Sequence, residues 1–241
     1  MQSLILSWRP VPTLHPVDAM KQPAPAHESA HSFEATGPAT TRRSAIGRLG
    51  GLAAAAVLWP VASARAAVDA ASLPEPKRTR AALYLEAREV PAFIDAQGGA
   101  ARVLFLDLRT RAEAMYVGMA TPVDALVPYV EHQELMTDWD AQRNIYRLEP
   151  LQDFVPEVNR RLSEKGLAKT DVVVLICRSG DRSSRGANRL ADDGYTRVYS
   201  VVDGFEGDLS KDGRRSVNGW KNAGLPWSYK LDKSKLYFPR G

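Results

Sequence analysis

Apolar runs alternate with amphipathic stretches along the chain from about residue 81 onward. Nearly continuous apolar runs at 101–108, 171–176 and 196–202 predict strands that are buried on both faces of a sheet. Shorter apolar runs predict two further strands, at 81–85 and 125–130. Apolar residues at helical spacing predict helices at 86–97, 150–166 and 181–194, each ending at or just before a glycine. This alternation predicts an α/β fold, with a doubly wound, mostly parallel sheet and helices on both faces.

One long stretch between these elements lacks either pattern. Residues 131–149 are polar and contain Trp139. We expect them to form a lid or a long connecting loop. The chain has no internal repeat, so its elements are expected to form a single domain.

The N-terminal part has the composition of an export signal. Arg42 and Arg43 precede an uncharged stretch rich in Ala and Gly, and an A-x-A pattern follows at 64–66. This order is typical of a secretory signal, and the arginine pair favours the twin-arginine type. The uncharged stretch is broken by Pro60 and is too short for a comfortable membrane span. An uncleaved anchor or an amphipathic arm is the alternative.

These features predict the organisation of the chain and its destination. Residues 1–66 are interpreted as an N-terminal extension with a twin-arginine signal peptide, and 67–80 as a linker. A domain at 81–229 and a basic tail at 230–241 follow. We expect the twin-arginine export machinery to deliver the protein to the periplasm, with no stable membrane anchor after cleavage. The sequence leaves open whether Met1 or Met20 is the true start.

Composition excludes several classes of function. Residues 1–66 hold six of the 32 basic and three of the 28 acidic side chains, which leaves 26 and 25, a net charge of +1. This balance gives no support to a nucleic-acid partner. Cys177 is the only cysteine, so disulfides within the chain and multi-cysteine metal sites are excluded. His132 is the only histidine after residue 66, and we expect no metal centre.

The stretch VVVLICRSGDRSSRG places Cys177 directly after a predicted strand and just before a predicted helix. Ligands of open α/β sheets bind at the carboxyl ends of strands, and a helix N-terminus carries partial positive charge. Gly180 allows a tight loop whose amides surround one point, and Arg178 and Arg182 add full positive charge. All these features favour a thiolate and an anionic ligand. The alternative is an inert cysteine in the core.

The segment CRSGDR resembles the active-site loop of rhodaneses, sulfurtransferases that carry sulfur as a cysteine persulfide. The interval from Cys177 to Arg182 matches that family. Related phosphatases use a loop one residue longer, and Ser183 stands at the position of their arginine, which disfavours a phosphatase or arsenate reductase. The resemblance covers roughly residues 80–228. It includes Asp107, Arg109 and Glu113 upstream, and the segments GFEGD and VNGWKNAGLPW downstream.

This resemblance implies a single rhodanese-like domain with sulfurtransferase activity. Cys177 would be the nucleophile, and Asp107, Arg109 and Ser183 would support it, the first two as an ion pair near the end of their strand. The residues expected to bind the donor are Arg178, Ser179, Gly180, Asp181 and Arg182.

The resemblance also implies the partners. They are a small anionic donor such as thiosulfate, a thiol or cyanide-like acceptor and, further, a protein acceptor of sulfur. No cofactor or metal is implied. A non-catalytic persulfide carrier or binding module, docking through residues 131–149, is the alternative function.

Overall fold

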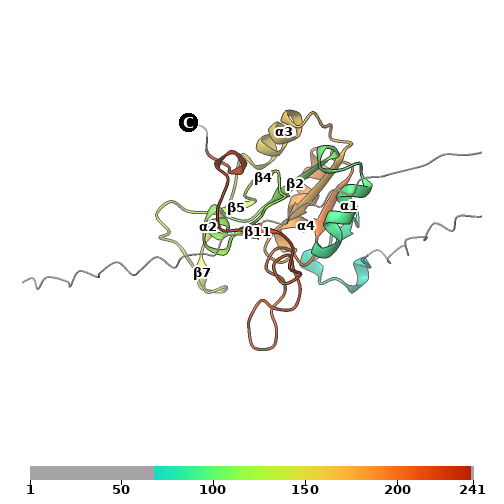
Figure 1. Ribbon diagram of the computed structural model, residues 1–241. Helices are drawn as coiled ribbons and strands as arrows, with labels where there is room; N and C mark the ends of the chain where they lie inside the picture. Colours follow the sequence, from blue (N-terminus) through green and yellow to red (C-terminus); the bar gives the residue numbers. More distant parts are fainter. Residues whose placement is uncertain (1–67, 240–241) are drawn as a thin grey trace, which may run out of the picture. The chain divides into compact units, whose positions relative to one another are not determined.

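The computed structural model describes residues 68–239, and its centre is a five-stranded parallel sheet (Figure 1). The order of the strands is β1-β10-β9-β2-β4, and all neighbouring pairs are parallel. These strands are β1 (Tyr84–Leu85), β2 (Val103–Asp107), β4 (Ala125–Leu126), β9 (Val172–Ile176) and β10 (Val198–Val201). The signal predicted within 1–66 lies outside the described residues.

Two apolar clusters cover the two faces of this sheet. Alternate residues of β9 point to opposite sides, so Val174 joins one cluster and Leu175 the other. Val90 and Ile94 of α1 (Val90–Ala96) and Ala114 of α2 (Arg111–Val117) belong to the first cluster. The helices α3 (Phe154–Glu164) and α4 (Asp181–Asp192) supply apolar side chains to the second. The doubly wound α/β fold with helices on both faces is confirmed.

Several observed elements are shorter than predicted. The helix expected at 86–97 begins as the 3-10 turn η3 (Ala87–Glu89) and continues as α1. The strand expected at 125–130 is only β4, and β5 (Val130–His132) belongs to another sheet. The remaining short elements are η1 (Ala70–Ser72), η2 (Glu75–Lys77), η4 (Ala100–Arg102), β3 (Met119–Ala120), β11 (Trp227–Ser228) and η5 (Lys233–Lys235).

The prediction of a lid or loop at 131–149 is wrong in one respect, because this stretch is largely paired. Strand β5 pairs antiparallel with β8 (Leu148–Pro150), and β6 (Trp139–Asp140) pairs with β7 (Ile145–Tyr146). Residues 130–150, which we call the insertion hairpin, therefore form two successive antiparallel strand pairs outside the central sheet (Figure 1). Strands of two or three residues are too short to produce a recognisable period in sequence.

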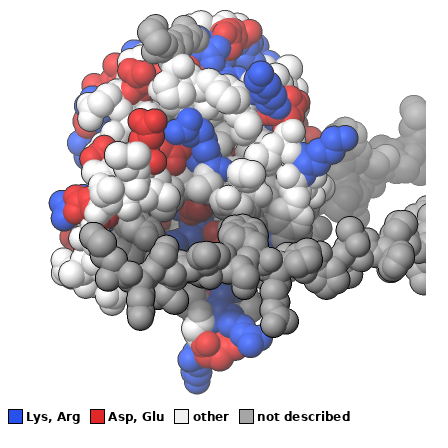
Figure 2. Space-filling view, turned by 90° about the vertical axis from the view of Figure 1, so that its left-hand side faces the viewer, with Lys and Arg blue, Asp and Glu red and all other residues white. Residues whose placement is uncertain are grey.

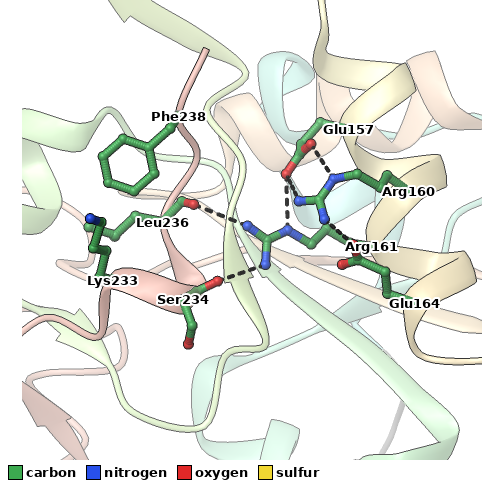
Figure 3. A pocket seen from close by; sticks show the side chains of 8 residues that line it. All are labelled: Glu157, Arg160, Arg161, Glu164, Lys233, Ser234, Leu236 and Phe238. Carbon is green, nitrogen blue, oxygen red and sulfur yellow. Dashed lines mark hydrogen bonds and ion pairs between the residues drawn. The ribbon is translucent and has the colours of Figure 1, made fainter. Parts of the chain in front are cut away.

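The segment predicted as a basic tail packs against the domain in its described part. Leu231 and Leu236 contact the first apolar cluster, and Arg161 of α3 donates to the backbone carbonyls of Ser234 and Leu236 (Figure 3). Basic and acidic side chains are interspersed on the face shown in Figure 2. Within residues 68–239, no helix has both the length and the apolar character that crossing a membrane requires.

Candidate functional site

Cys177 lies at the carboxyl end of β9, the middle strand of the sheet, immediately before the Cys177 loop (residues 178–180) turns into α4. Gly180 takes a left-handed conformation with φ of 100°, which lets α4 begin at Asp181. A Cβ atom at Gly180 would lie 2.2 Å from the carbonyl oxygen of Val202. Only glycine fits this turn, because any side chain would meet both the strain of positive φ and the backbone of the next strand.

Cys177 belongs to the second apolar cluster, but its thiol also has polar neighbours. Cys177 is only 1% exposed, and its Sγ accepts a hydrogen bond from the backbone N–H of Gly180 at 3.2 Å. The thiol donates to Ser183 Oγ at 3.6 Å, and Ser200 Oγ donates to Ser183 Oγ at 2.9 Å. A hydroxyl group rotates freely, so Ser183 is also able to donate a hydrogen bond to Sγ. The sulfur therefore has hydrogen-bonding groups from both the loop and α4.

The backbone around the loop is held by the segment that follows β10. The carbonyl of Cys177 accepts the N–H of Phe205 at 2.7 Å, and that of Arg178 accepts the N–H of Glu206 at 3.0 Å. Among the described residues, the N–H groups of Arg178 and Ser179 have no hydrogen-bond partner. The first N–H groups of α4 also lack partners within the helix. The loop therefore presents a set of free donors beside the thiol, which suits an anion.

Arg182 does not extend into solvent as a free cation. Its guanidinium is 10% exposed and donates to both carboxylate oxygens of Glu113, at 2.6 and 2.5 Å. Burial alone would raise the pKa of Glu113, but the hydrogen bond and charge of Arg182 lower it from 4.5 to about 2. Burial likewise opposes the charge of Arg182, and Glu113 more than compensates, so the pKa of Arg182 lies above its usual value. The pair fixes the first turn of α4 to α2.

The other predicted donor-binding side chains have different environments. Arg178 is exposed, and within residues 68–239 its guanidinium makes no hydrogen bond or ion pair, so it is available to a ligand. Asp181 pairs with Arg185 at 2.6 Å, one helical turn further along α4. Ser179 is half-buried at the tip of the loop.

The predicted pairing of Asp107 with Arg109 is present, and both side chains are fully buried. Arg109 Nη2 donates to Asp107 Oδ2 at 2.6 Å and to the carbonyl of Gly118 at 2.8 Å. The guanidinium also stacks on the ring of Phe205, 3.9 Å from its centroid. Since Phe205 holds the carbonyl of Cys177, this ion pair supports the loop from below and does not face a ligand.

A pocket of about 770 Å³ adjoins the loop, and we call it the loop pocket. Its first wall belongs to the starts of α2 and α4 and to the loop, with Thr110, Glu113, Arg178, Asp181, Arg182 and Arg185. Its second wall belongs to Tyr129 and the insertion hairpin and includes Trp139, Ile145 and Tyr146. No local pattern in the sequence places these side chains beside Arg178, because only the tertiary structure brings them to one pocket.

A second pocket, of about 570 Å³, lies between α3 and the C-terminal segment (Figure 3). Glu157 pairs there with both Arg160 and Arg161, and Arg160 also pairs with Glu164. These charges satisfy one another, so the second pocket has a structural explanation. Within the described part of the chain, no group of three or more His, Cys, Asp or Glu side chains is placed to hold a metal ion.

Comparison with known proteins adds a family relationship. A model of the rhodanese-like domain matches residues 90–211. The uncharacterized RP600 homolog of Rickettsia rickettsii is 31% identical over 124 residues, covering 52% of this chain and 81% of that protein. Uncharacterized protein RC0915 of Rickettsia conorii is 28% identical over 126 residues, with the same coverage. The crystal structure of Rv0390 from M. tuberculosis aligns with a TM-score of 0.45 and 26% identity, over 61% of this chain and 97% of that one.

Proposed function

The chain belongs to the rhodanese-like domain family, and on this basis we propose that it is a sulfurtransferase that moves sulfane sulfur from an anionic, thiosulfate-like donor to a nucleophilic acceptor. The observation that supports this most is the environment of Cys177. Its Sγ accepts the Gly180 N–H at the carboxyl end of the central strand, beside the unpaired N–H groups of Arg178 and Ser179. This arrangement places a nucleophilic sulfur beside hydrogen-bond donors that suit a bound anion.

The first step forms a persulfide on the enzyme. The Cys177 thiolate attacks the outer sulfur of thiosulfate, and the S–S bond of the donor breaks. The electron pair of that bond leaves with sulfite, while the outer sulfur stays on Sγ as a persulfide anion. In the second step an acceptor nucleophile attacks this outer sulfur, and the electron pair returns to Sγ. Neither step needs a metal or an organic cofactor.

The side chains of the loop take different roles in this scheme. Arg178 is the free cation and attracts the sulfonate of the donor, while the amides of the loop stabilise the charge that develops during transfer. Arg182 has a positioning role, because Glu113 engages both of its terminal nitrogens. This differs from the direct donor contact that sequence reasoning assigned to Arg182. Asp107, Arg109 and Ser183 support the loop from the buried side.

We further propose that the protein works in the periplasm after export through the twin-arginine machinery. The support is Arg42 and Arg43 before the uncharged stretch, together with the A-x-A pattern at 64–66. Replacing both arginines with lysine should retain the precursor inside the cell. Fractionation of cells that carry each form tests this, and equal periplasmic amounts of both forms would refute it.

Intact mass spectrometry tests the sulfurtransferase proposal directly. The protein is measured after thiosulfate treatment and again after cyanide, for the wild type and for Cys177→Ser. We expect one added sulfur atom that cyanide removes, and no addition in the variant. Failure of every anionic donor to add sulfur would overturn the proposal. Repeated turnover with small acceptors identifies an enzyme, whereas loading without turnover identifies a persulfide carrier.

A further inference from the structure

The loop pocket is larger than its proposed inorganic donor requires. A volume of about 770 Å³ is in the range of roughly 300–1,000 Å³ that is typical of sites for organic ligands. Thiosulfate is far smaller and needs only the loop amides and Arg178. Cys177 is 1% exposed and does not line the pocket, which meets the loop at Arg178. The remaining space is large enough for an organic ligand beside the donor.

The wall formed by the insertion hairpin has the composition of a binding surface. Trp139, Ile145 and Tyr146 all line the pocket and remain 49%, 41% and 46% exposed. The rings of Trp139 and Tyr146 meet edge to face, with centroids 5.3 Å apart. Large apolar side chains gain free energy when a ligand covers them, and aromatic pairs of this kind add preferred contact geometry.

The hairpin is built firmly enough to hold this wall in place. At its base, Glu131 accepts the backbone N–H of Arg111 at 3.1 Å and its Nε at 2.9 Å, which joins β5 to α2. At its tip, Asp140 Oδ1 accepts the N–H groups of Gln142 and Arg143. These bonds shape the turn that brings Arg143 to the rim of the pocket.

The charges of the pocket determine the sign of the occupant. Its lining contains four arginines and two carboxylates, a net charge of two positive with His132 neutral. Arg182 is matched by Glu113, and Arg185 by Asp181. Arg178 has no partner among residues 68–239, and Arg143 reaches Asp140 only at 4.0 Å. An anionic group on the ligand therefore has two cations available.

We propose that the sulfur acceptor is an organic thiol that carries a carboxylate and an aromatic or other bulky apolar group. This inference rests on the proposed sulfurtransferase function. The apolar group binds against Trp139, Ile145 and Tyr146, and the carboxylate binds Arg143 or Arg178. The acceptor thiolate attacks the outer sulfur of the Cys177 persulfide. The S–S bond of that persulfide breaks, its electron pair returns to Sγ, and the acceptor leaves as an organic persulfide anion.

Three matched thiols test this proposal: thiolactate, β-phenylthiolactate, and the analogue of the latter with methyl in place of the carboxylate. The enzyme is first loaded with thiosulfate and freed of excess donor, and the loss of the persulfide is then followed by intact mass. We expect β-phenylthiolactate to discharge the persulfide about tenfold faster than thiolactate, the effect of one good aromatic contact. The methyl analogue should discharge the persulfide about tenfold more slowly than β-phenylthiolactate, because it lacks the carboxylate.

Variants test whether the side chains of the insertion hairpin cause the preference for the aromatic thiol. In a double variant with Trp139→Ala and Tyr146→Ala, the preference for β-phenylthiolactate over thiolactate should fall below about twofold. Met115→Ala removes another exposed apolar side chain, 61% exposed on α2 and outside the pocket lining, and should leave the preference unchanged. Each variant is compared only after its persulfide has formed, which shows that the loop is intact.

The outcomes separate the two proposals. If no persulfide forms, the sulfurtransferase function fails. If the persulfide forms but wild-type enzyme discharges to both carboxylate thiols at the same rate, the proposal of an aromatic organic acceptor is wrong. It is also wrong if the double variant keeps the full preference, or if neither thiol removes the sulfur, in which case the pocket serves a protein acceptor instead.

Discussion

Replacing Glu113 with glutamine should destabilise the domain, because it leaves the Arg182 guanidinium buried without its counter-charge. The two side chains are 18% and 10% exposed, and two hydrogen bonds join them. Breaking one partner of a buried ion pair is far more damaging than removing a surface pair, because the remaining charge has neither water nor an opposite charge. The change keeps the size and shape of the side chain, so packing is preserved.

The size of the effect follows from the titration of Glu113. A pKa lowered from 4.5 to about 2 corresponds to about 3 kcal/mol of preferential stabilisation of the charged form in the folded state. Loss of one partner from buried pairs in other proteins costs roughly 3–5 kcal/mol, which agrees with this figure. We therefore expect Glu113→Gln to lower the free energy of unfolding by about 3 kcal/mol at pH 7.

The effect should also depend on pH in a defined direction. Since the pKa of Glu113 is lowered on folding, its contribution is complete above the unfolded pKa of 4.5 and is lost as the pH falls through about 2. Urea denaturation of the wild type and the variant at several pH values from about 7 to about 2 measures the difference between their free energies of unfolding. This difference in the free energy of unfolding should be constant above about pH 5 and should become smaller below that value.

A matched control is Asp192→Asn, which breaks an ion pair with Arg80 whose side chains are 52% and 59% exposed. That change should cost less than about 1 kcal/mol. The reasoning fails if Glu113→Gln costs no more than this control. It also fails if the difference between the wild type and Glu113→Gln persists unchanged at acid pH.

Further expectations concern the loop itself. Gly180→Ala should abolish persulfide loading measured by intact mass, because its Cβ would lie 2.2 Å from the Val202 oxygen, whereas Gly213→Ala, with no atom within 4 Å, should load normally. Loading by Gly180→Ala at the wild-type rate would show that the loop tolerates rearrangement. Ser183→Ala removes the hydroxyl that lies 3.6 Å from Cys177 Sγ and should slow persulfide loading several-fold at pH 7. An unchanged loading rate in stopped-flow measurements would contradict this expectation. Arg178→Ala should raise the KM for thiosulfate about fivefold with little change in kcat, and steady-state kinetics showing an unaltered KM would remove Arg178 from donor binding.

Much of the fold was predictable because its signals are local. The strand expected at 171–176 is β9 (Val172–Ile176), and the helix expected at 181–194 is α4 (Asp181–Asp192). Both elements have long, regular patterns of apolar residues. Helix α2 was not predicted, because it has only seven residues and a single buried one, Ala114. Its capping box, Thr110 with Glu113, is the signal that was available in the sequence.

The sequence by itself determined the centre of the candidate site. A buried strand, Cys177, a glycine that alone accepts positive φ, and a helix follow one another within a few residues. Local geometry is enough to bring them together. The tertiary structure decided what surrounds that centre. Arg182 and Glu113 are 69 residues apart, and their pairing gives the expected ligand-binding cation a buried partner on α2. Trp139 and Tyr146 line the same pocket as Arg178, on a hairpin that Glu131 joins to α2. Such contacts depend on how distant segments pack, and no local pattern encodes them.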